Sequence, residues 1–270
     1  MRVVFASARS SPGVTTTALA CASSWPGRVL LVEAAEDGGA LAARFGLPIE
    51  PGLTTLAAAS RHATDDEGLL QRHVQSLPGT ERIVALVGPP SMEPAQALLR
   101  TSAARLATLL TTVPDDMAVL IDAGRLLSPS LAAPLIAVAD QLVVVARPRV
   151  EELTGLAHRL PVLSELGPPL QVLLVGDQPY GPREVAETFG VAMAGVLARD
   201  VTAAETLAAA GSSRTLARSA LLRSAAGVVD TLLAGIDSSP SPGAQSSSGS
   251  APKVNGATVS KKRWPVSRRL

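Results

Sequence analysis

Seven short apolar runs, separated by longer segments, most strongly constrain what this chain can fold into. The runs are rich in valine and leucine, and several of the segments between them place alanine and leucine at helical spacing. Continuous apolar runs suit strands that are covered on both faces, and helices supply the crossovers between parallel strands. The sequence therefore predicts an α/β fold, a doubly wound and mostly parallel sheet of about seven or eight strands with helices on both faces. The predicted strands cover residues 2–6, 28–33, 82–88, 117–123, 141–147, 171–176 and 191–198.

The segments between the runs carry helical patterns with recognisable ends. After Pro94, alanine and leucine recur at helical spacing along one face. Thr202 and Glu205 have the spacing of a capping box, and Gly211 predicts the end of the helix that they begin. A last helical pattern covers residues 216–236.

Composition bounds the class of protein. With 270 residues, 47% of them apolar, the chain can bury a substantial core, but only 2% are aromatic, which disfavours the stacking of bases on aromatic rings. The single cysteine, Cys21, cannot form an intrachain disulfide, and charged residues interrupt the most hydrophobic region before it is long enough to span a membrane. The N-terminal apolar run is too short for a signal peptide. The sequence therefore predicts a cytoplasmic protein.

The C-terminal segment differs in composition from the rest. Residues 237–270 hold six of the 24 Lys and Arg residues but one of the 23 acidic residues, and apolar patterning stops there. We expect one folded domain over residues 1–237 and a disordered tail over residues 238–270. The basic end, KKRWPVSRRL, predicts either a weak contact with an anionic membrane or with DNA, or a tail that only keeps the protein in solution. A membrane contact would place the protein peripherally at the membrane.

Three loops at the ends of predicted strands could carry chemistry, because ligands in open α/β sheets bind beyond the carboxyl ends of the strands. The first reads SARSSPGVTTTA, and successive amides at its helix start can bind an anion. The second reads AAEDGG after residues 28–33, and the third begins at Asp122, where Mg²⁺ could be held through water. Ordinary helix capping and turn formation are the alternative interpretation of each.

The first loop resembles a known sequence motif. RSSPGVTTT is similar to the deviant Walker A loop of the ParA/MinD family of P-loop proteins, K-G-G-x-G-K-T-[TS]. The resemblance continues through VLLVEAAEDGG, MAVLIDAG and ADQLVVVARPRVEELTGL to the end of the ordered chain, over roughly residues 2–236. It implies a P-loop NTPase-like fold that binds ATP and Mg²⁺, forms a homodimer and acts with a protein partner of a partitioning or pilus machine.

The resemblance also implies roles for individual residues. Arg9 matches the family's signature lysine, which would reach across a dimer interface, and Val14 matches the phosphate-binding lysine. Thr15 and Asp122 match the magnesium site, and Asp177 falls in the loop that contacts the base, although a turn role before Pro179 is equally consistent with its position. The nucleotide-binding residues expected in this way are Arg9, Ser10, Ser11, Gly13, Val14, Thr15, Thr16, Thr17 and Asp177.

Departures from the motif predict a degenerate site. Val14 carries no charge, Ala35 replaces the aspartate that positions the attacking water, and Glu33 replaces the first aspartate of the second motif. Pro12 has no amide hydrogen to offer a phosphate. Because phosphoryl transfer depends on charge neutralisation and on placing the nucleophile, we expect hydrolysis to be weak or lost and nucleotide binding to be weak or absent.

Three functions remain open at this point. The first is a positional or regulatory switch of partitioning, cell-division or Tad/Flp pilus-localisation type, since GVTTTALA is similar to the core of CpaE/TadZ-like proteins. The second is a scaffold that keeps the fold and the dimer surface without nucleotide. The third, an ATP-dependent ligase or synthetase, is disfavoured by Val14. Arg147 and Arg149 could face the nucleotide or a partner, or could form solvated pairs with Glu151 and Glu152.

Overall fold

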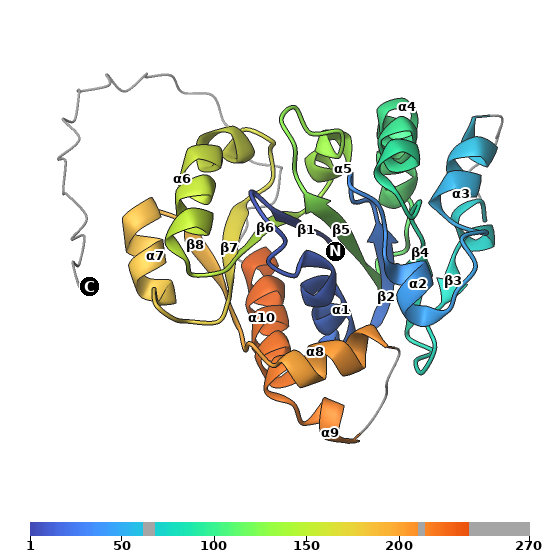
Figure 1. Ribbon diagram of the computed structural model, residues 1–270. Coiled ribbons are helices and arrows are strands. Elements are labelled where there is room, and N and C mark those ends of the chain that lie inside the picture. Colours follow the sequence, from blue (N-terminus) through green and yellow to red (C-terminus); the bar gives the residue numbers. More distant parts are fainter. Residues whose placement is uncertain (62–67, 210–213, 238–270) are drawn as a thin grey trace. The chain divides into compact units, whose positions relative to one another are not determined.

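One eight-stranded sheet organises the chain (Figure 1). The computed structural model describes residues 1–61, 68–209 and 214–237. The strand order is β3–β4–β2–β5–β1–β6–β7–β8, and every neighbouring pair is parallel except β3 and β4. The strands are β1 (Arg2–Ser7), β2 (Arg28–Glu33), β3 (Gln75–Ser76), β4 (Ile83–Leu86), β5 (Met117–Arg125), β6 (Gln141–Ala146), β7 (Leu170–Val175) and β8 (Ala192–Leu197). The predicted fold class is confirmed, and only β3, two residues long, has no counterpart among the predicted strands.

Helices cover both faces of the sheet (Figure 1). Residues of α1, α2, α8 and α10 join one hydrophobic core, and residues of α3 to α7 join the other. The helices are α1 (Val14–Ser24), α2 (Leu41–Phe45), α3 (Leu53–Ser60), α4 (Met92–Thr111), α5 (Ala133–Ala137), α6 (Val150–Ser164), α7 (Pro182–Phe189), α8 (Val201–Ala208), α9 (Arg214–Ala217) and α10 (Ala220–Asp237), with a short 3₁₀ helix over Leu70–Arg72.

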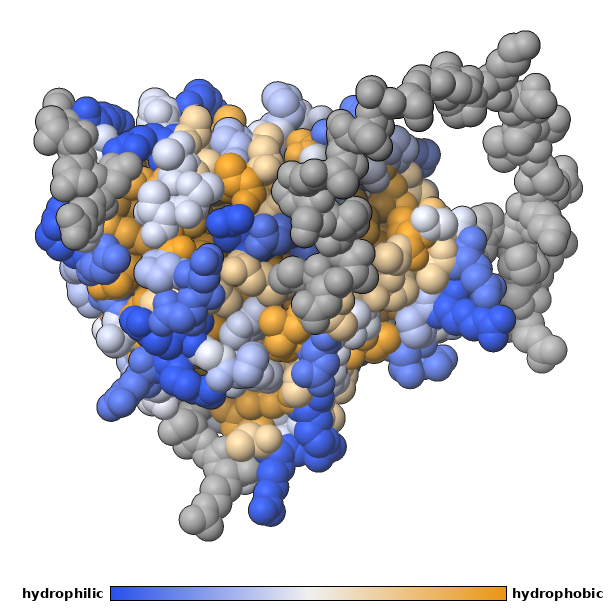
Figure 2. Space-filling view, turned by 180° about the vertical axis from the view of Figure 1, so that it is seen from behind, coloured by the Kyte–Doolittle hydropathy of each residue, from blue (hydrophilic) through white to orange (hydrophobic). Residues whose placement is uncertain are grey.

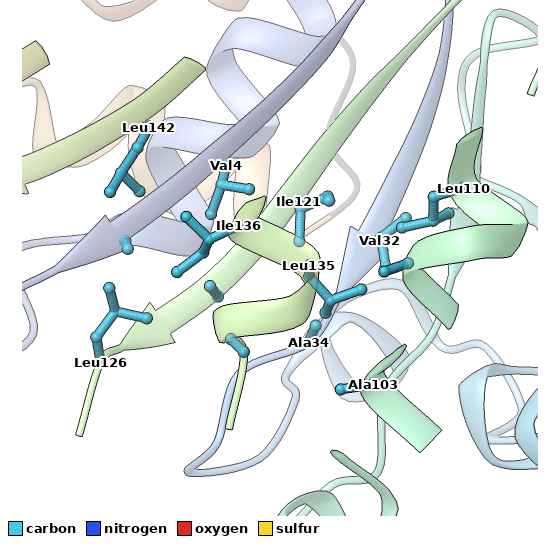
Figure 3. Close-up of a cluster of buried hydrophobic side chains, with 14 of the residues drawn as sticks. Val4, Val32, Ala34, Ala103, Leu110, Ile121, Leu126, Leu135, Ile136 and Leu142 are labelled. Carbon is cyan, nitrogen blue, oxygen red and sulfur yellow. The ribbon is translucent and has the colours of Figure 1, made fainter. Parts of the chain in front are cut away.

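The alternation of side chains along each strand separates the two cores. In β1, Val3 and Phe5 pack on the α1 side, whereas Val4 and Ala6 pack on the opposite side. Figure 3 shows part of the second core, where Val4 lies near Ile136. These four residues of β1 are all fully buried, which explains why this part of the strand is an uninterrupted apolar run in the sequence.

The topology places the end of β1 at a crossing point of the chain. β1 lies between β5 and β6, and the chain builds one half of the sheet as far as β5 before it passes to β6 on the other side. Such a switch point opens a crevice at the carboxyl ends of the strands. The loop between β1 and α1 therefore lies between the ends of β5 and β6.

The helix predictions are partly corrected by the structure. The helix after Pro94 is confirmed within α4, but Asp200, not Thr202, caps α8, because its Oδ1 accepts a hydrogen bond from the Ala203 amide at 3.0 Å. The single helix predicted over 216–236 is two helices, since the Ser219 hydroxyl accepts from the Leu222 amide at 3.2 Å and starts α10 anew.

Two predictions concern residues outside those that the structure describes. Gly211, the expected end of α8, and the tail over residues 238–270 both lie there. In the described part of the chain no helix is both long and apolar enough to cross a membrane. Hydrophilic residues are interspersed with apolar ones on the face shown in Figure 2.

Candidate functional site

The loop between β1 and α1 presents backbone amides at a helix start. Gly13, with φ 109°, caps α1 in a left-handed conformation, and its carbonyl accepts the first helical hydrogen bond, from Thr17, at 2.8 Å. The amides of Val14, Thr15 and Thr16 therefore have no partner within the helix. Together with the helix dipole they favour an anion at this end of α1.

Ser10 adopts a backbone conformation that normally favours glycine. Its φ is 60°, and in the described part of the chain no other non-glycine residue has a positive φ. This is a position where the resemblance places a glycine, the residue that adopts such a conformation most readily. The left-handed conformation costs roughly 1 kcal/mol for a residue with a side chain. Ser11 is exposed beside it.

Val14 fills core space instead of facing a ligand. Its side chain is 6% exposed and belongs to the apolar cluster on the α1 face of the sheet. Thr17 is also buried, whereas Thr15 and Thr16 remain partly exposed. At the position of the family's lysine the loop therefore offers an apolar contact to the core and no positive charge.

Asp122 lies under the helix start at the end of the central sheet. It is in register with Phe5 of β1 and Glu33 of β2, and the alternation along β5 directs its side chain to the α1 face. The carboxyl is 1% exposed; Oδ1 accepts a hydrogen bond from the Gly124 amide at 2.9 Å, whereas Oδ2 has no hydrogen-bond partner in the described part of the chain. A buried acceptor in this state is available to a ligand.

Opposing influences act on the pKa of Asp122. Burial raises it above its usual value, and the nearby Thr15 hydroxyl, the Gly124 amide and the Arg44 guanidinium act in the opposite direction. Arg44, on α2, also has a buried nitrogen, Nη1, without a hydrogen-bond partner among the described residues. Sequence inspection did not single out Arg44, because its approach to Asp122 depends on how α2 packs.

The Thr15 and Asp122 side chains fit a magnesium ion. Mg²⁺ keeps several waters and is usually bound through one or two carboxylates together with phosphate oxygens. The Asp122 carboxyl, which interacts with the Thr15 hydroxyl and whose Oδ2 has no hydrogen-bond partner among the described residues, supplies such a carboxylate. No cluster of three or more acidic, histidine or cysteine side chains suited to a metal occurs in the described residues, so the remaining ligands would come from water and phosphate.

Glu33 is fully engaged in holding the second loop. Its Oε1 accepts hydrogen bonds from the amides of Ala40 and Leu41 at 2.6 and 2.8 Å, and its Oε2 accepts from the Gly88 amide at 3.0 Å. Burial raises the pKa of this carboxyl, with the three amides acting in the opposite direction. A Cβ on Gly39 would lie 2.2 Å from Oε2, which explains the glycine there. Glu33 therefore anchors the start of α2.

The other positions of the second loop differ in whether they offer a carboxylate to a ligand. Ala35 is buried against Gly124, so its position carries no carboxylate at the site. Glu36 is buried, and its Oε1 accepts hydrogen bonds from the Ser130 hydroxyl at 2.7 Å and the Leu131 amide at 2.9 Å. Asp37 is exposed and acts electrostatically on Asp122. Its proximity to Asp122 was not evident from the sequence.

Arg9 and Arg147 make different contacts around the loop. Arg9 is exposed, and its aliphatic stem runs beside Gly155 of α6, where an added Cβ would lie 2.7 Å from the Arg9 Cδ. Arg147 donates from Nη2 to the Ser11 carbonyl at 3.0 Å. Arg147 also pairs with Glu152, with Nη1 at 3.8 Å from Oε1, but Glu152 is buried and the pair is therefore not the solvated one that the sequence offered as an alternative.

A cavity of about 260 Å³ opens beside the loop. It lies between the loop, the ends of β7 and β8 and the start of α8, and the residues that line it include Pro12, Gly13, Thr16, Thr17, Arg147 and Arg199. Asp177 is exposed and does not line this cavity, so its contact with a base stays a prediction. A second cavity, of about 280 Å³, is lined mostly by apolar residues such as Leu19, Phe45 and Leu77.

Similarity to known proteins was found through structure alone. No protein-family model matches the sequence, and a search of curated proteins also gives no match. A ParA family ATPase from Chlorobium tepidum TLS superposes with a TM-score of 0.69 at 18% identity, over 84% of this chain and 98% of that chain. MinD from Pyrococcus horikoshii OT3, complexed with Mg-ADP, superposes with a TM-score of 0.66 at 17% identity, over 88% of this chain and 98% of that chain. A Cyanothece McdA variant in complex with ATP superposes with a TM-score of 0.65 at 20% identity, over 86% of this chain and 95% of that chain. At these identities the likeness establishes the fold.

Proposed function

We propose that this chain, which has the ParA/MinD-like P-loop fold, is a positional or regulatory switch protein that binds Mg²⁺-nucleotide weakly and hydrolyses it slowly or not at all. Its task would be to locate a cellular machine of partitioning, cell-division or pilus-assembly type, as a dimer and with a protein partner. The observation that carries the proposal is Asp122, a buried carboxyl with one oxygen left without a partner beneath the start of α1.

Retention of an incompletely paired buried carboxyl supports binding. A buried acceptor without a hydrogen bond costs about 1–3 kcal/mol, and a buried carboxylate costs more. Asp122 interacts with the Thr15 hydroxyl close to the switch point of the sheet, and the neighbouring Thr16 lines a cavity of about 260 Å³. A chain that had kept the fold only as a scaffold would gain stability by replacing this residue.

The loss of hydrolysis rests on the second loop. Ala35 carries no carboxylate, and both Glu33 and Glu36 use their carboxylates to bind backbone amides. Among the described residues of this loop, Asp37 is therefore the only exposed acidic side chain. Placement of the nucleophile is a main contribution to phosphoryl transfer, so turnover should be at or near background.

Titration with ATP in the presence of Mg²⁺ tests the proposal. We expect weak but saturable binding by calorimetry, loss of that binding in Thr15→Ala, and no phosphate release above a protein-free control. The matched control is Thr206→Ala on the exposed face of α8, which should bind as the parent does. Absence of binding at millimolar ATP would favour the nucleotide-free scaffold. Rapid hydrolysis that Thr15→Ala abolishes would show that another residue has replaced Ala35.

A further inference from the structure

The site lacks a lysine in its loop but has an arginine held against that loop. Arg147 follows β6, which pairs with β1, and its Nη2 donates to the Ser11 carbonyl at 3.0 Å. Its side chain lines the same cavity as Gly13 and Thr16. A guanidinium group therefore lies against the loop and faces the same cavity as the start of α1, although Arg147 does not belong to the loop.

A buried carboxylate fixes the position of this arginine. Glu152, in the first turn of α6, is 6% exposed at its side chain; its Oε2 accepts from the Arg147 amide at 2.9 Å, and its Oε1 lies 3.8 Å from the Arg147 Nη1. The same carboxylate thus holds both the backbone and the guanidinium of Arg147. The Arg147 side chain nevertheless remains 40% exposed, so a ligand can reach it.

Arg147 retains donors for a phosphate. A guanidinium has five N–H donors in a planar fork, which suits two phosphate oxygens at once. The contact with Ser11 uses one donor, and the 3.8 Å approach to Glu152 is an ion pair rather than a short hydrogen bond. Arginine also stays charged at every physiological pH.

The other arginines near the site are less well placed. Arg9 lies along α6 at Gly155, and Arg44 acts on the buried Asp122 carboxyl. Arg199 lines the cavity but is exposed at its rim. Among these residues, Arg147 is the one that contacts the loop backbone and is also oriented by a buried partner.

We propose that Arg147 supplies the phosphate-binding positive charge that Val14 cannot supply, so that the cation of this site comes from the β6–α6 connection and not from α1. The inference rests on the proposed function, since it requires that the site binds a phosphorylated ligand. It places the defining contact in the β6–α6 connection and explains how the loop can retain Val14 as a core residue.

Binding of adenosine, ADP and ATP by the parent and by Arg147→Ala tests this inference. We expect Arg147→Ala to weaken ATP binding roughly 10- to 100-fold, as charge-assisted hydrogen bonds are lost, while adenosine binding changes less than about 2-fold. Arg147→Lys should give an intermediate affinity, because it keeps the charge without the fork. The matched control is Arg149→Ala, which removes the same charge two residues away and should bind ATP like the parent.

The outcomes separate this inference from the function on which it rests. Failure of the parent to bind ATP overturns the proposed function, and with it the role of Arg147. Parent binding that Arg147→Ala retains overturns the role of Arg147 alone. Equal losses for adenosine and ATP, accompanied by a lower melting temperature of the ligand-free protein, would assign Arg147 to holding the loop and would also reject it as the phosphate-binding cation.

Discussion

Two neighbouring buried carboxyls show how local contacts decide the role of a residue. Glu33 and Asp122 are in register on adjacent strands, and burial raises the pKa of both. Glu33 receives hydrogen bonds from three backbone amides, whereas Asp122 receives one from Gly124 and leaves Oδ2 without a partner in the described chain. The first residue therefore stabilises the fold, and the second is available for binding at the expense of stability.

Asp122→Asn should stabilise the ligand-free protein at neutral pH. A carboxyl whose native pKa is raised holds its proton more tightly in the native state than in the unfolded state, so its ionisation weakens the native state as the pH rises. The neutral amide avoids this cost, and we expect a gain on the order of 1–2 kcal/mol in urea unfolding at pH 7 to 8. The gain should shrink as the pH falls through the native pKa towards the ordinary value of 3.8.

The exposed Asp177→Asn serves as the control for Asp122→Asn and should change stability little at any pH. An asparagine variant less stable than the parent at pH 7 would mean that the Arg44 charge already compensates Asp122. In that case the argument that Asp122 is retained for binding would lose its energetic basis.

Glu33→Gln should have the opposite effect. An amide group replaces one acceptor oxygen by an NH₂, which would face the Gly88 amide or those of Ala40 and Leu41. A donor against a donor leaves both unpaired, so we expect a loss of about 1–3 kcal/mol in the free energy of unfolding. Glu151→Gln, exposed at the start of α6, is the control. Unchanged stability of Glu33→Gln in urea would contradict this account.

At the scale of elements, helix starts explain where the sequence patterns were wrong. Thr202 and Glu205 have capping-box spacing, yet α8 begins two residues earlier than a Thr202 cap would allow, because the Asp200 carboxylate accepts from the Ala203 amide. Ser219 caps α10 in the same manner and divides the last helical pattern. A capping pattern identifies candidates, and packing then selects which of them forms the cap.

Asp200→Ala should therefore weaken α8 and Thr202→Ala should not. Loss of an aspartate cap typically costs about 1 kcal/mol, whereas Thr202 is exposed within the first turn. Urea unfolding of the two variants measures the difference. If Thr202→Ala proved the more damaging of the two, the capping box expected from the sequence would be restored.

At the scale of the whole molecule, three exposed apolar residues begin helices at the carboxyl edge of the sheet. Val150 and Val201 are each 56% exposed, and they begin the helices that follow β6 and β8. Met92 begins the helix after β4 and is 40% exposed. The proposed switch requires a surface for a second copy of the chain, and this edge is where we propose that it lies.

Arg9→Ala should reduce any ATP-dependent dimer. Arg9 is exposed beside the loop and lies along α6, from which its long side chain could extend to a partner's phosphates. Sedimentation with Mg²⁺ and ATP should show a dimer for the parent and mostly monomer for Arg9→Ala. The control is Arg183→Ala, whose side chain is 90% exposed on α7. An ATP-dependent dimer that survives in Arg9→Ala would remove Arg9 from the interface.

The sequence by itself determined the sheet and the position of the loop. Doubly covered strands must be apolar throughout, so residues 2–6, 28–33 and 117–123 were recognisable as strands without any knowledge of their neighbours. The same patterns predicted a loop beginning at Asp122, whereas β5 continues through Asp122 to Arg125. The two-residue β3 was missed because a strand so short contains no period.

The tertiary structure decided which polar side chains meet at the loop and which are already engaged. Parallel strands far apart in the sequence bring Arg147 to Ser11 and place Asp122 beside Glu33, and neither contact has a local sequence signal. Hydrogen bonding then separated Glu33, bound by three amides, from Asp122, whose Oδ2 has no hydrogen-bond partner among the described residues. Local periodicity encodes which face of an element is covered, but the partners of a buried charge depend on side chains that the fold brings in from other strands.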